Sequence, residues 1–442
     1  MPYLLNVLYL AVIALASPYL LWHSFRSGKY REGFYEKLLG LVPRRESRHR
    51  CLWLHAVSVG EVNLLMPIVE RWERLHPDWE IVISTTTATG FALAHKRYAP
   101  RMVFYCPLDF TWSTAQAMHR IRPDLLVLTE LELWPNLIRA ARRSGVKVAV
   151  INGRLSEKSF RGYSRVKRFL ASTLQSIDTI AAQNEEYASR FRALGANGER
   201  VCVTGSIKFD GAQLSRENPR TQSLARLAGI TAGDHVFLAG STQAPEEEIA
   251  TSIYLRLRES SPQLKLILVP RHPERFEEVA RMLTARGVEF VRRSQLDPAS
   301  SKLSLARREL PAPRVILVDA VGELGSWWGT ARAAFVGGSL GKRGGQNMIE
   351  PAAYGCAVAF GPNTWNFRDV VSEMLAHDAA VVVQNEAELD AFVQRTILEP
   401  GFAAEIGARA HALVKRQVGA ADRTIGLLES LILPNGSTAR AA

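Results

Sequence analysis

The chain has 442 residues, of which 47% are hydrophobic and 22% charged, and its formal net charge is +12. This length suffices for two domains, and the composition excludes an intrinsically disordered chain. The basic balance favours anionic partners such as phosphorylated substrates, acidic lipid or nucleic acid, and composition does not choose among them.

The first segment, residues 3–22, is apolar over about the length of a bilayer span. Basic residues follow it from Arg26 to Arg50 and none precedes it, which predicts that the rest of the chain lies in the cytoplasm. We therefore expect residues 1–24 to form a single-pass membrane-anchor helix. A helix lying in the membrane interface, bent at Pro18, and a signal peptide are the alternatives.

Short apolar, β-branched runs alternate with helical patterns between residues 51 and 205, which predicts parallel strands joined by crossover helices. The stretch 55–61 leads from one of these strands into a helix and places Glu61 on the first helical turn. A glutamate at this position commonly caps the helix or complements its dipole. The alternative is a general base at the carboxyl end of a parallel strand, where α/β folds bind ligands.

Polar residues follow later strand ends of the same predicted sheet. Glu130, Glu132 and Asn136 come after one strand, and Asn152 and Arg154 come after the next. Solvated helix starts are the simpler interpretation, and a polar cleft is the other. Ser206 and Lys208 lie at the predicted domain junction, where the lysine could reach a bound phosphate.

A polar stretch, residues 211–235, separates this alternation from a second one that begins at His235. We expect an N-terminal domain over 25–210, a C-terminal domain over 211–432 and a flexible tail over 433–442. Residues 294–313 are polar and contain three prolines, and we expect a surface excursion there.

The second predicted sheet also carries candidate ligand-binding residues at its strand ends. Backbone N–H groups, hydroxyls, a guanidinium and a glycine-rich loop suit a phosphate or nucleotide, whereas helix caps and ion pairs are the structural alternatives. The candidates are Ser241, Thr242, Arg271, His272, Gly322, Glu323, Leu324, and Asn347 and Glu350 beside the glycine-rich stretch 337–345.

The sequence contains no Asp-x-Asp, P-loop, Gly-x-Gly-x-x-Gly or zinc-ligand spacing. The four cysteines are far apart and show no metal spacing. The sequence therefore predicts no metal site.

Seven motifs, in order, resemble those of the 3-deoxy-D-manno-octulosonic acid (Kdo) transferase family, and the resemblance extends to about residue 420. They are WLHAVSVGE at 53–61, ELELWPNL at 130–137, NGRLS at 152–156, TGSIKFD at 204–210, AGST at 239–242, PRHPERF at 270–276 and GGS…GGQN…EPA between 337 and 352.

This resemblance implies a GT-B fold, in which two doubly wound Rossmann-like domains face each other across a cleft. It also implies an N-terminal membrane anchor that precedes the two domains in the chain. It implies an inverting, metal-independent transfer of Kdo from CMP-Kdo to a lipid A precursor at the cytoplasmic face of the inner membrane, without a cofactor. The N-terminal domain would take the acceptor and the C-terminal domain the nucleotide. Nucleic acid is not an expected partner, because the basic residues are spread out without interleaved aromatics.

By motif position, Glu61 would be the general base, with Glu130 and Glu132 in the acceptor or catalytic environment. The residues that would line the CMP site are Ser206, Lys208, Arg271, His272, Gly322, Glu323, Leu324, Asn347 and Glu350.

Two positions depart from the family pattern. Gln346 stands where a histidine is usual, so proton transfer at that position is in doubt, and Leu131 replaces a more usual threonine. The rival interpretations are another GT-B transferase with a different nucleotide sugar and a lipid-linked acceptor, and a non-catalytic two-lobed binding protein.

Overall fold

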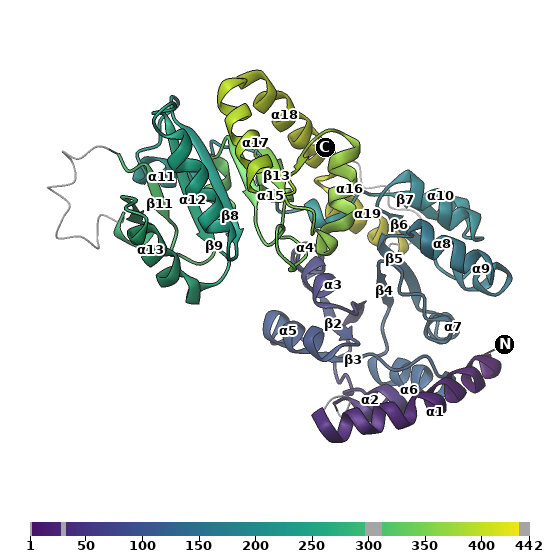
Figure 1. Ribbon diagram of the computed structural model, residues 1–442. Helices are drawn as coiled ribbons and strands as arrows, with labels where there is room; N and C mark the ends of the chain where they lie inside the picture. The colour runs from purple at the N-terminus through teal and green to yellow at the C-terminus, as the bar shows by residue number, and fades with distance from the viewer. Residues whose placement is uncertain (1, 28–31, 297–311, 433–442) are drawn as a thin grey trace. The chain divides into compact units, whose positions relative to one another are not determined.

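The computed structural model describes residues 2–27, 32–296 and 312–432, and its chain forms two compact units (Figure 1). The first unit comprises the chain up to Asp210 together with the residues from Gln417 onward. The second comprises Gly211–Arg416. Each unit is built on its own parallel sheet, and the two are described separately.

The sheet of the first unit has seven parallel strands in the order β3-β2-β1-β4-β5-β6-β7. The direction of strand succession reverses between β1 and β4, as in Rossmann folds. The strands are β1 Arg50–His55, β2 Trp79–Thr85, β3 Val103–Tyr105, β4 Leu125–Thr129, β5 Lys147–Gly153, β6 Thr179–Ala182 and β7 Val201–Val203. The helices are α1 Pro2–Ser27, α2 Phe34–Leu39, α3 Val59–Leu64, α4 Met66–Leu75, α5 Ala88–Tyr98, α6 Thr111–Ile121, α7 Pro135–Arg143, α8 Glu157–Ser164, α9 Lys167–Gln175, α10 Glu185–Ala193 and α19 Ala420–Ile432.

Both faces of this sheet are buried, which explains why its strands are continuously apolar. In β1, Cys51 and Trp53 belong to the core on one face, whereas Leu52 and Leu54 belong to the core on the other. This alternation follows from the two-residue period of a strand. The carboxyl ends of the strands therefore carry the first polar residues that the sheet can present to a ligand.

The sheet of the second unit also has seven parallel strands, in the order β10-β11-β9-β8-β12-β13-β14, and its direction reverses between β8 and β12. The strands are β8 His235–Thr242, β9 Leu264–Pro270, β10 Val291–Arg292, β11 Val315–Leu317, β12 Ala333–Val336, β13 Ala357–Phe360 and β14 Val381–Val382. The helices are α11 Pro219–Leu227, α12 Glu246–Leu257, α13 Phe276–Ala285, α14 Leu324–Trp327, α15 Ile349–Ala353, α16 Arg368–Ala376, α17 Glu386–Leu398 and α18 Pro400–Gln417.

The division after Asp210 coincides with the predicted boundary, but the predicted C-terminal domain extends too far. Helix α19 belongs to the first unit, where Ile425 and Leu428 join the core on the α4 face of the sheet. The Asp210 carboxylate accepts hydrogen bonds from the Gly419 and Ala421 N–H groups at 2.6 and 2.5 Å, which fixes the start of α19.

Two further elements differ from expectation. The helix predicted to follow the stretch 55–61 is split into α3 and α4, because Pro67 lies at the start of α4 and has no N–H for a continuous helix. The short edge strand β10 was not predicted. Most of the expected surface excursion and the whole expected tail, residues 433–442, lie outside the described residues.

Helix α1 lies against the start of α6 (Figure 1). Asn6 donates to the Thr111 hydroxyl oxygen at 2.8 Å and accepts from the Thr111 N–H at 3.1 Å, and the Tyr9 hydroxyl lies 3.2 Å from Asp109 Oδ2. We expected a single-pass span, but within residues 2–27, 32–296 and 312–432 no helix has the length and apolar character to cross a membrane.

Candidate functional site

Glu61 lies at the point of the first sheet where the strand order reverses. It is the third residue of α3, which follows β1, and its side chain reaches Thr129 at the carboxyl end of the neighbouring β4. Ligands of open α/β sheets bind in the crevice at such a reversal. The fold therefore places this carboxylate where a substrate would meet the first unit.

Three donors hold the Glu61 carboxylate. Oε2 accepts from the Val57 N–H at 3.0 Å and the Thr129 hydroxyl at 2.7 Å, and Oε1 accepts from the Ser58 hydroxyl at 2.8 Å. Ser58 is also the N-cap of α3. Glu61 thus orders the helix start, as the structural interpretation predicted. A carboxylate has about four acceptor positions, so Oε1 retains capacity for a further hydrogen bond from a substrate hydroxyl.

His55, at the end of β1, is a buried polar residue beside this site that received no role from the sequence. Its Nδ1 lies 2.9 Å from the Ser84 hydroxyl, and its Nε2 has no hydrogen-bond partner among the described residues. Burial lowers the pKa of His55 to about 4, although the Glu61 carboxylate acts in the opposite direction. The imidazole is therefore neutral at physiological pH.

Glu130 and Glu132 lie in the loop between β4 and α7, on the same edge as Glu61. Glu130 adopts a left-handed backbone conformation, with φ of 52°, and forms an ion pair with Lys208 at 3.3 Å. Glu132 Oε2 accepts from the Trp134 indole N–H at 3.0 Å. Burial, and then the negative charges of Glu61 and Glu130, raise the pKa of Glu132 to about 7. The structure therefore brings the three predicted glutamates into one acidic cluster.

Glu132→Gln is expected to stabilise the protein at alkaline pH. Because the pKa of Glu132 rises from 4.5 to about 7 on folding, its ionised form opposes folding; this effect is absent below about pH 4.5 and complete above about pH 7. Glutamine cannot ionise and can still accept from Trp134. After allowance for solvent screening, we expect a gain of about 1–2 kcal/mol at pH 8.

Thermal unfolding measured from pH 5 to pH 8 checks this prediction. The difference in Tm between Glu132→Gln and the parent protein should grow with pH. Glu70→Gln, at an exposed position of α4, is the matched control and should show no such trend. A Tm difference independent of pH would mean that Glu132 does not ionise against the field of the acidic cluster.

The second unit has a buried carboxylate at the corresponding strand reversal. Glu246, the first residue of α12, is 1% exposed, and both of its oxygens accept backbone N–H groups. Oε2 accepts from Gln243 and Gly338 at 2.9 and 2.7 Å, and Oε1 accepts from Ser339 and Leu340 at 3.0 and 3.1 Å. The first amides of the glycine-rich stretch are therefore occupied by Glu246, whereas we expected them to be available to a phosphate.

The remaining predicted nucleotide residues of the second unit are found in two places, near α14 and beside the glycine-rich stretch. Glu350 accepts from the Asn347 amide at 3.0 Å and lies beside the start of α14, because a Cβ on Gly325 would be 3.6 Å from Glu350 Oε2. Burial raises the pKa of Glu350, and the charge of Arg271 partly offsets this rise. Asn347 and Glu350 thus lie close to the start of α14, the helix that begins at Leu324.

Glu323 is engaged differently from the other predicted residues of that loop. Its carboxylate accepts from two nitrogens of Arg293, at 2.8 and 3.1 Å, and lies 3.3 Å from the Trp327 indole nitrogen. The Glu323 side chain therefore has a structural role within the second unit. Gly322 has a φ of 84°, and its carbonyl oxygen accepts from Arg220 at 3.3 Å.

A basic cavity of about 340 Å³ lies beside the glycine-rich stretch. The residues that line it include His272, Arg275, Lys342 and Arg343. Ser241 lies near this edge with φ of 54°, whereas Thr242 is fully buried, its hydroxyl oxygen 3.5 Å from the Val269 carbonyl oxygen. Among the residues that the structure describes, no three His, Cys, Asp or Glu side chains form a group that could hold a metal ion.

Two of the predicted nucleotide residues lie in the first unit. Ser206 is buried, and its N–H donates to the Gln417 side chain at 3.0 Å, whereas Lys208 pairs with Glu130. The first unit therefore carries an acidic cluster, Glu61, Glu130 and Glu132, and the second unit carries the basic cavity.

Known proteins with similar sequences identify the family of this chain. Residues 29–211 match the family model described as 3-Deoxy-D-manno-octulosonic-acid transferase (kdotransferase). The 3-deoxy-D-manno-octulosonic acid transferase of Haemophilus influenzae is 31% identical over 423 residues, which cover 93% of this chain and 94% of that protein. The enzyme of the same name from Bordetella pertussis is 32% identical and covers 86% of each chain.

A solved structure supports the fold alone. The UDP-GlcNAc 2-epimerase from Neisseria meningitidis, bound to UDP-GlcNAc, has a TM-score of 0.53 and 12% identity, with 86% of this chain and 100% of that chain covered. The two parallel-sheet α/β units resemble those of GT-B glycosyltransferases. The chain belongs to the Kdo transferase family, whose members are glycosyltransferases that transfer Kdo in lipopolysaccharide synthesis.

Proposed function

We propose that this protein transfers Kdo from CMP-Kdo to a lipid A precursor, with Glu61 as the general base. The observation that carries the proposal is the position of the Glu61 carboxylate at the strand reversal of the first unit, held by three donors and still able to accept a fourth hydrogen bond. Family membership supports the reaction class, and this geometry supports Glu61 as the base.

In the proposed reaction a sugar hydroxyl of the acceptor attacks the anomeric carbon of Kdo. Such a hydroxyl has a pKa far above neutral, so its proton passes to Glu61 as the new C–O bond forms. The bond between Kdo and the CMP phosphate breaks, and CMP leaves with the bonding electrons. The anomeric centre is inverted, and Glu130 and Glu132 border the acceptor.

The basic cavity of the second unit and the predicted residues near α14 suit the nucleotide. We propose that Arg271, Asn347, Glu350 and the backbone of residues 322–324 bind CMP, and that Lys342 and Arg343 offset charge on its phosphate. Charge stabilisation of the leaving phosphate by fixed donors would lower the barrier to its departure. No metal or cofactor takes part in the proposal.

We further propose that helix α1 attaches the protein to the cytoplasmic face of the inner membrane by lying in the interface, which was the second of our expectations for this segment. Its polar residues Asn6 and Tyr9 face α6, while much of its apolar surface is exposed. The exposed large apolar side chains of α1 are Tyr3, Leu4, Val7, Leu8, Leu10, Val12, Leu15, Tyr19 and Trp22. Such a surface favours an interfacial position.

The direct test incubates the purified full chain with CMP-Kdo and a tetra-acylated lipid A precursor and measures product mass. An increase by one or more Kdo residues supports the proposal and counts the sugars added. No product with this pair would contradict the assigned substrates.

A nucleotide panel separates the proposal from another GT-B transferase. CMP and CTP should raise the Tm of the protein, because a ligand that binds only the folded state stabilises it, by about 2.7 kcal/mol at a hundredfold excess over Kd. UDP should have little effect. Stabilisation by UDP and not by CMP would favour the rival donor.

A further inference from the structure

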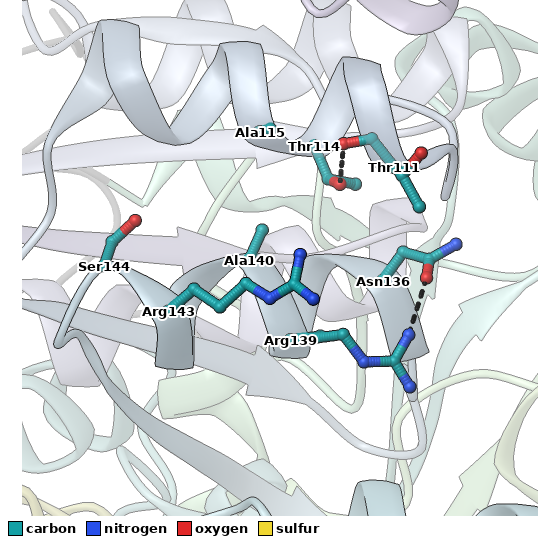
Figure 2. Close-up of a pocket in the computed structure, with 8 residues that line it drawn as sticks. All are labelled: Thr111, Thr114, Ala115, Asn136, Arg139, Ala140, Arg143 and Ser144. Atoms are coloured by element: carbon teal, nitrogen blue, oxygen red, sulfur yellow. Dashed lines mark hydrogen bonds between the residues drawn. The ribbon is translucent and has the colours of Figure 1, made fainter. Parts of the chain in front are cut away.

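A second polar cavity, of about 120 Å³, lies between α6 and α7 in the first unit (Figure 2). Its lining residues are Thr111, Thr114, Ala115, Asn136, Arg139, Ala140, Arg143 and Ser144. Since a water occupies about 30 Å³ in the liquid, the cavity has room for a small polyatomic group. Neither the sequence motifs nor the proposed reaction uses this cavity.

Two guanidinium groups face the cavity without a carboxylate between them. Both extend along α7 toward Asn136 (Figure 2), and neither Arg139 nor Arg143 forms an ion pair with any acid that the structure describes. Arg142, between them in sequence, is by contrast paired with Asp178 at 2.7 Å. Among the residues that the structure describes, Arg139 donates only to the Asn136 amide oxygen, at 3.1 Å.

Asp109, whose carboxylate interacts electrostatically with Arg139, is already engaged by other donors. The Asp109 carboxylate accepts from the Asn136 and Leu137 N–H groups at 3.1 and 2.9 Å and from the Tyr9 hydroxyl. It caps α7 and is 3% exposed. The cavity therefore retains an excess of positive charge, which favours an anionic ligand.

Neutral donors complete the lining. The Thr111 hydroxyl oxygen accepts from Asn6, so its own proton is left to donate, and in the described part of the chain the Ser144 hydroxyl has no hydrogen-bond partner. Two arginines with hydroxyl donors match the several oxygens of a phosphate group, because guanidinium binds phosphate through paired N–H bonds.

The position of the cavity indicates where this phosphate comes from. Thr111 contacts α1 through Asn6, and the next residue, Trp112, is 43% exposed. Helix α1, whose exposed large side chains are apolar, thus contacts a residue that lines the basic cavity, and such a pairing is expected where a protein meets the headgroup layer of a membrane.

We propose that the α6–α7 cavity binds the phosphomonoester of a lipid at the membrane surface. A phosphomonoester carries close to two negative charges and three free oxygens, which two arginines can bind more completely than they can bind a singly charged diester. The inference rests on the proposed membrane attachment through α1, but not on the Kdo-transfer reaction.

Vesicle co-sedimentation of the full chain tests this inference. Three compositions are compared: phosphatidylcholine alone, phosphatidylcholine with phosphatidate, and phosphatidylcholine with phosphatidylglycerol adjusted to the same surface potential. We expect the chain to bind phosphatidate vesicles roughly tenfold more tightly than the charge-matched vesicles. Arg139→Lys/Arg143→Lys keeps both charges but removes the paired N–H geometry, and should lose this preference while still binding phosphatidylglycerol vesicles.

The control is Arg258→Lys/Arg281→Lys, at two exposed positions of the second unit, which should keep the preference. Equal binding to the two anionic compositions would overturn the proposal, as would a preference that persists in Arg139→Lys/Arg143→Lys. Loss of the preference with millimolar inorganic phosphate would assign the cavity to free phosphate instead. Absence of binding to every vesicle would refute membrane attachment, whereas Kdo transfer is measured separately.

Discussion

Glu61→Gln is expected to slow Kdo transfer by a factor of about 10²–10⁴ while the first unit stays folded, as is usual for loss of a general base. Glutamine is nearly isosteric and its carbonyl oxygen can accept from Val57 or Ser58, so the start of α3 can be retained. It cannot take a proton from the attacking hydroxyl. The variant therefore separates the two roles that Glu61 combines in this structure.

The measurement is the transfer rate from CMP-Kdo, alongside Tm and CMP affinity. Glu70→Gln is the matched control, because Glu70 is exposed on the neighbouring α4 and lies outside the site. We expect CMP affinity to be unchanged in both variants, since the residues proposed to bind CMP lie in the second unit. Parental rates in Glu61→Gln would refute the assignment of the base.

Apart from the two-residue edge strand β10, the strands of both sheets were predictable, because buried parallel strands appear in the sequence as continuous apolar runs. The return of α19 to the first unit was not predictable in the same way. Its apolar pattern shows a buried face but does not specify which sheet covers it. The deciding contact is the cap from Asp210 to Gly419 and Ala421, across more than two hundred residues of sequence.

The acidic cluster of the first unit was anticipated for a general reason. Residues that follow parallel strands meet at one sheet edge, so Glu61, Glu130 and Glu132 could be grouped without knowledge of their contacts. Their chemistry could not be read in the same way. The raised pKa of Glu132 depends on burial and on the distances to two other carboxylates, which are properties of the folded chain.

Helix α1 makes contacts that its composition does not reveal. The segment is apolar enough in outline to predict a span, but Asn6 and Tyr9 are bound to the start of α6. Only the contacts show that one side of this helix packs on protein. The basic cavity beside it was also missed, because Arg139 and Arg143 look like ordinary surface charges of an amphipathic helix.

The amides of the glycine-rich stretch also differ from what the sequence predicted. Glycines at a strand end predicted amides open to a phosphate, whereas three of those amides bind the Glu246 carboxylate. In the sequence Glu246 is one of three successive glutamates at a helix start, and nothing local distinguishes it from Glu247 or Glu248. Only the fold identifies which of the three is buried against the loop.

Glu246→Gln is expected to destabilise the second unit by about 3–5 kcal/mol. Burial raises the pKa of this carboxyl and its backbone donors act against the rise, and all four groups around it are N–H donors, so the geometry suits an ionised carboxylate. A glutamine NH₂ would face two of these donors and leave them without an acceptor. At about 2–4 °C per kcal/mol for a unit of this size, Tm should fall by roughly 10 °C.

The loss should extend from stability to nucleotide binding. Without a carboxylate to fix the amides of Gly338, Ser339 and Leu340, the following loop with Lys342 and Arg343 loses its anchor, and we expect CMP to bind more weakly even below the new Tm. Glu248→Gln is the matched control, because Glu248 lies two residues along the same helix in an exposed, 3.5 Å contact with Arg286. It should leave both quantities almost unchanged, since exposed ion pairs contribute little. If Glu246→Gln unfolded like the parent protein, the amides of the loop would not depend on this carboxylate, and they could then serve a phosphate directly.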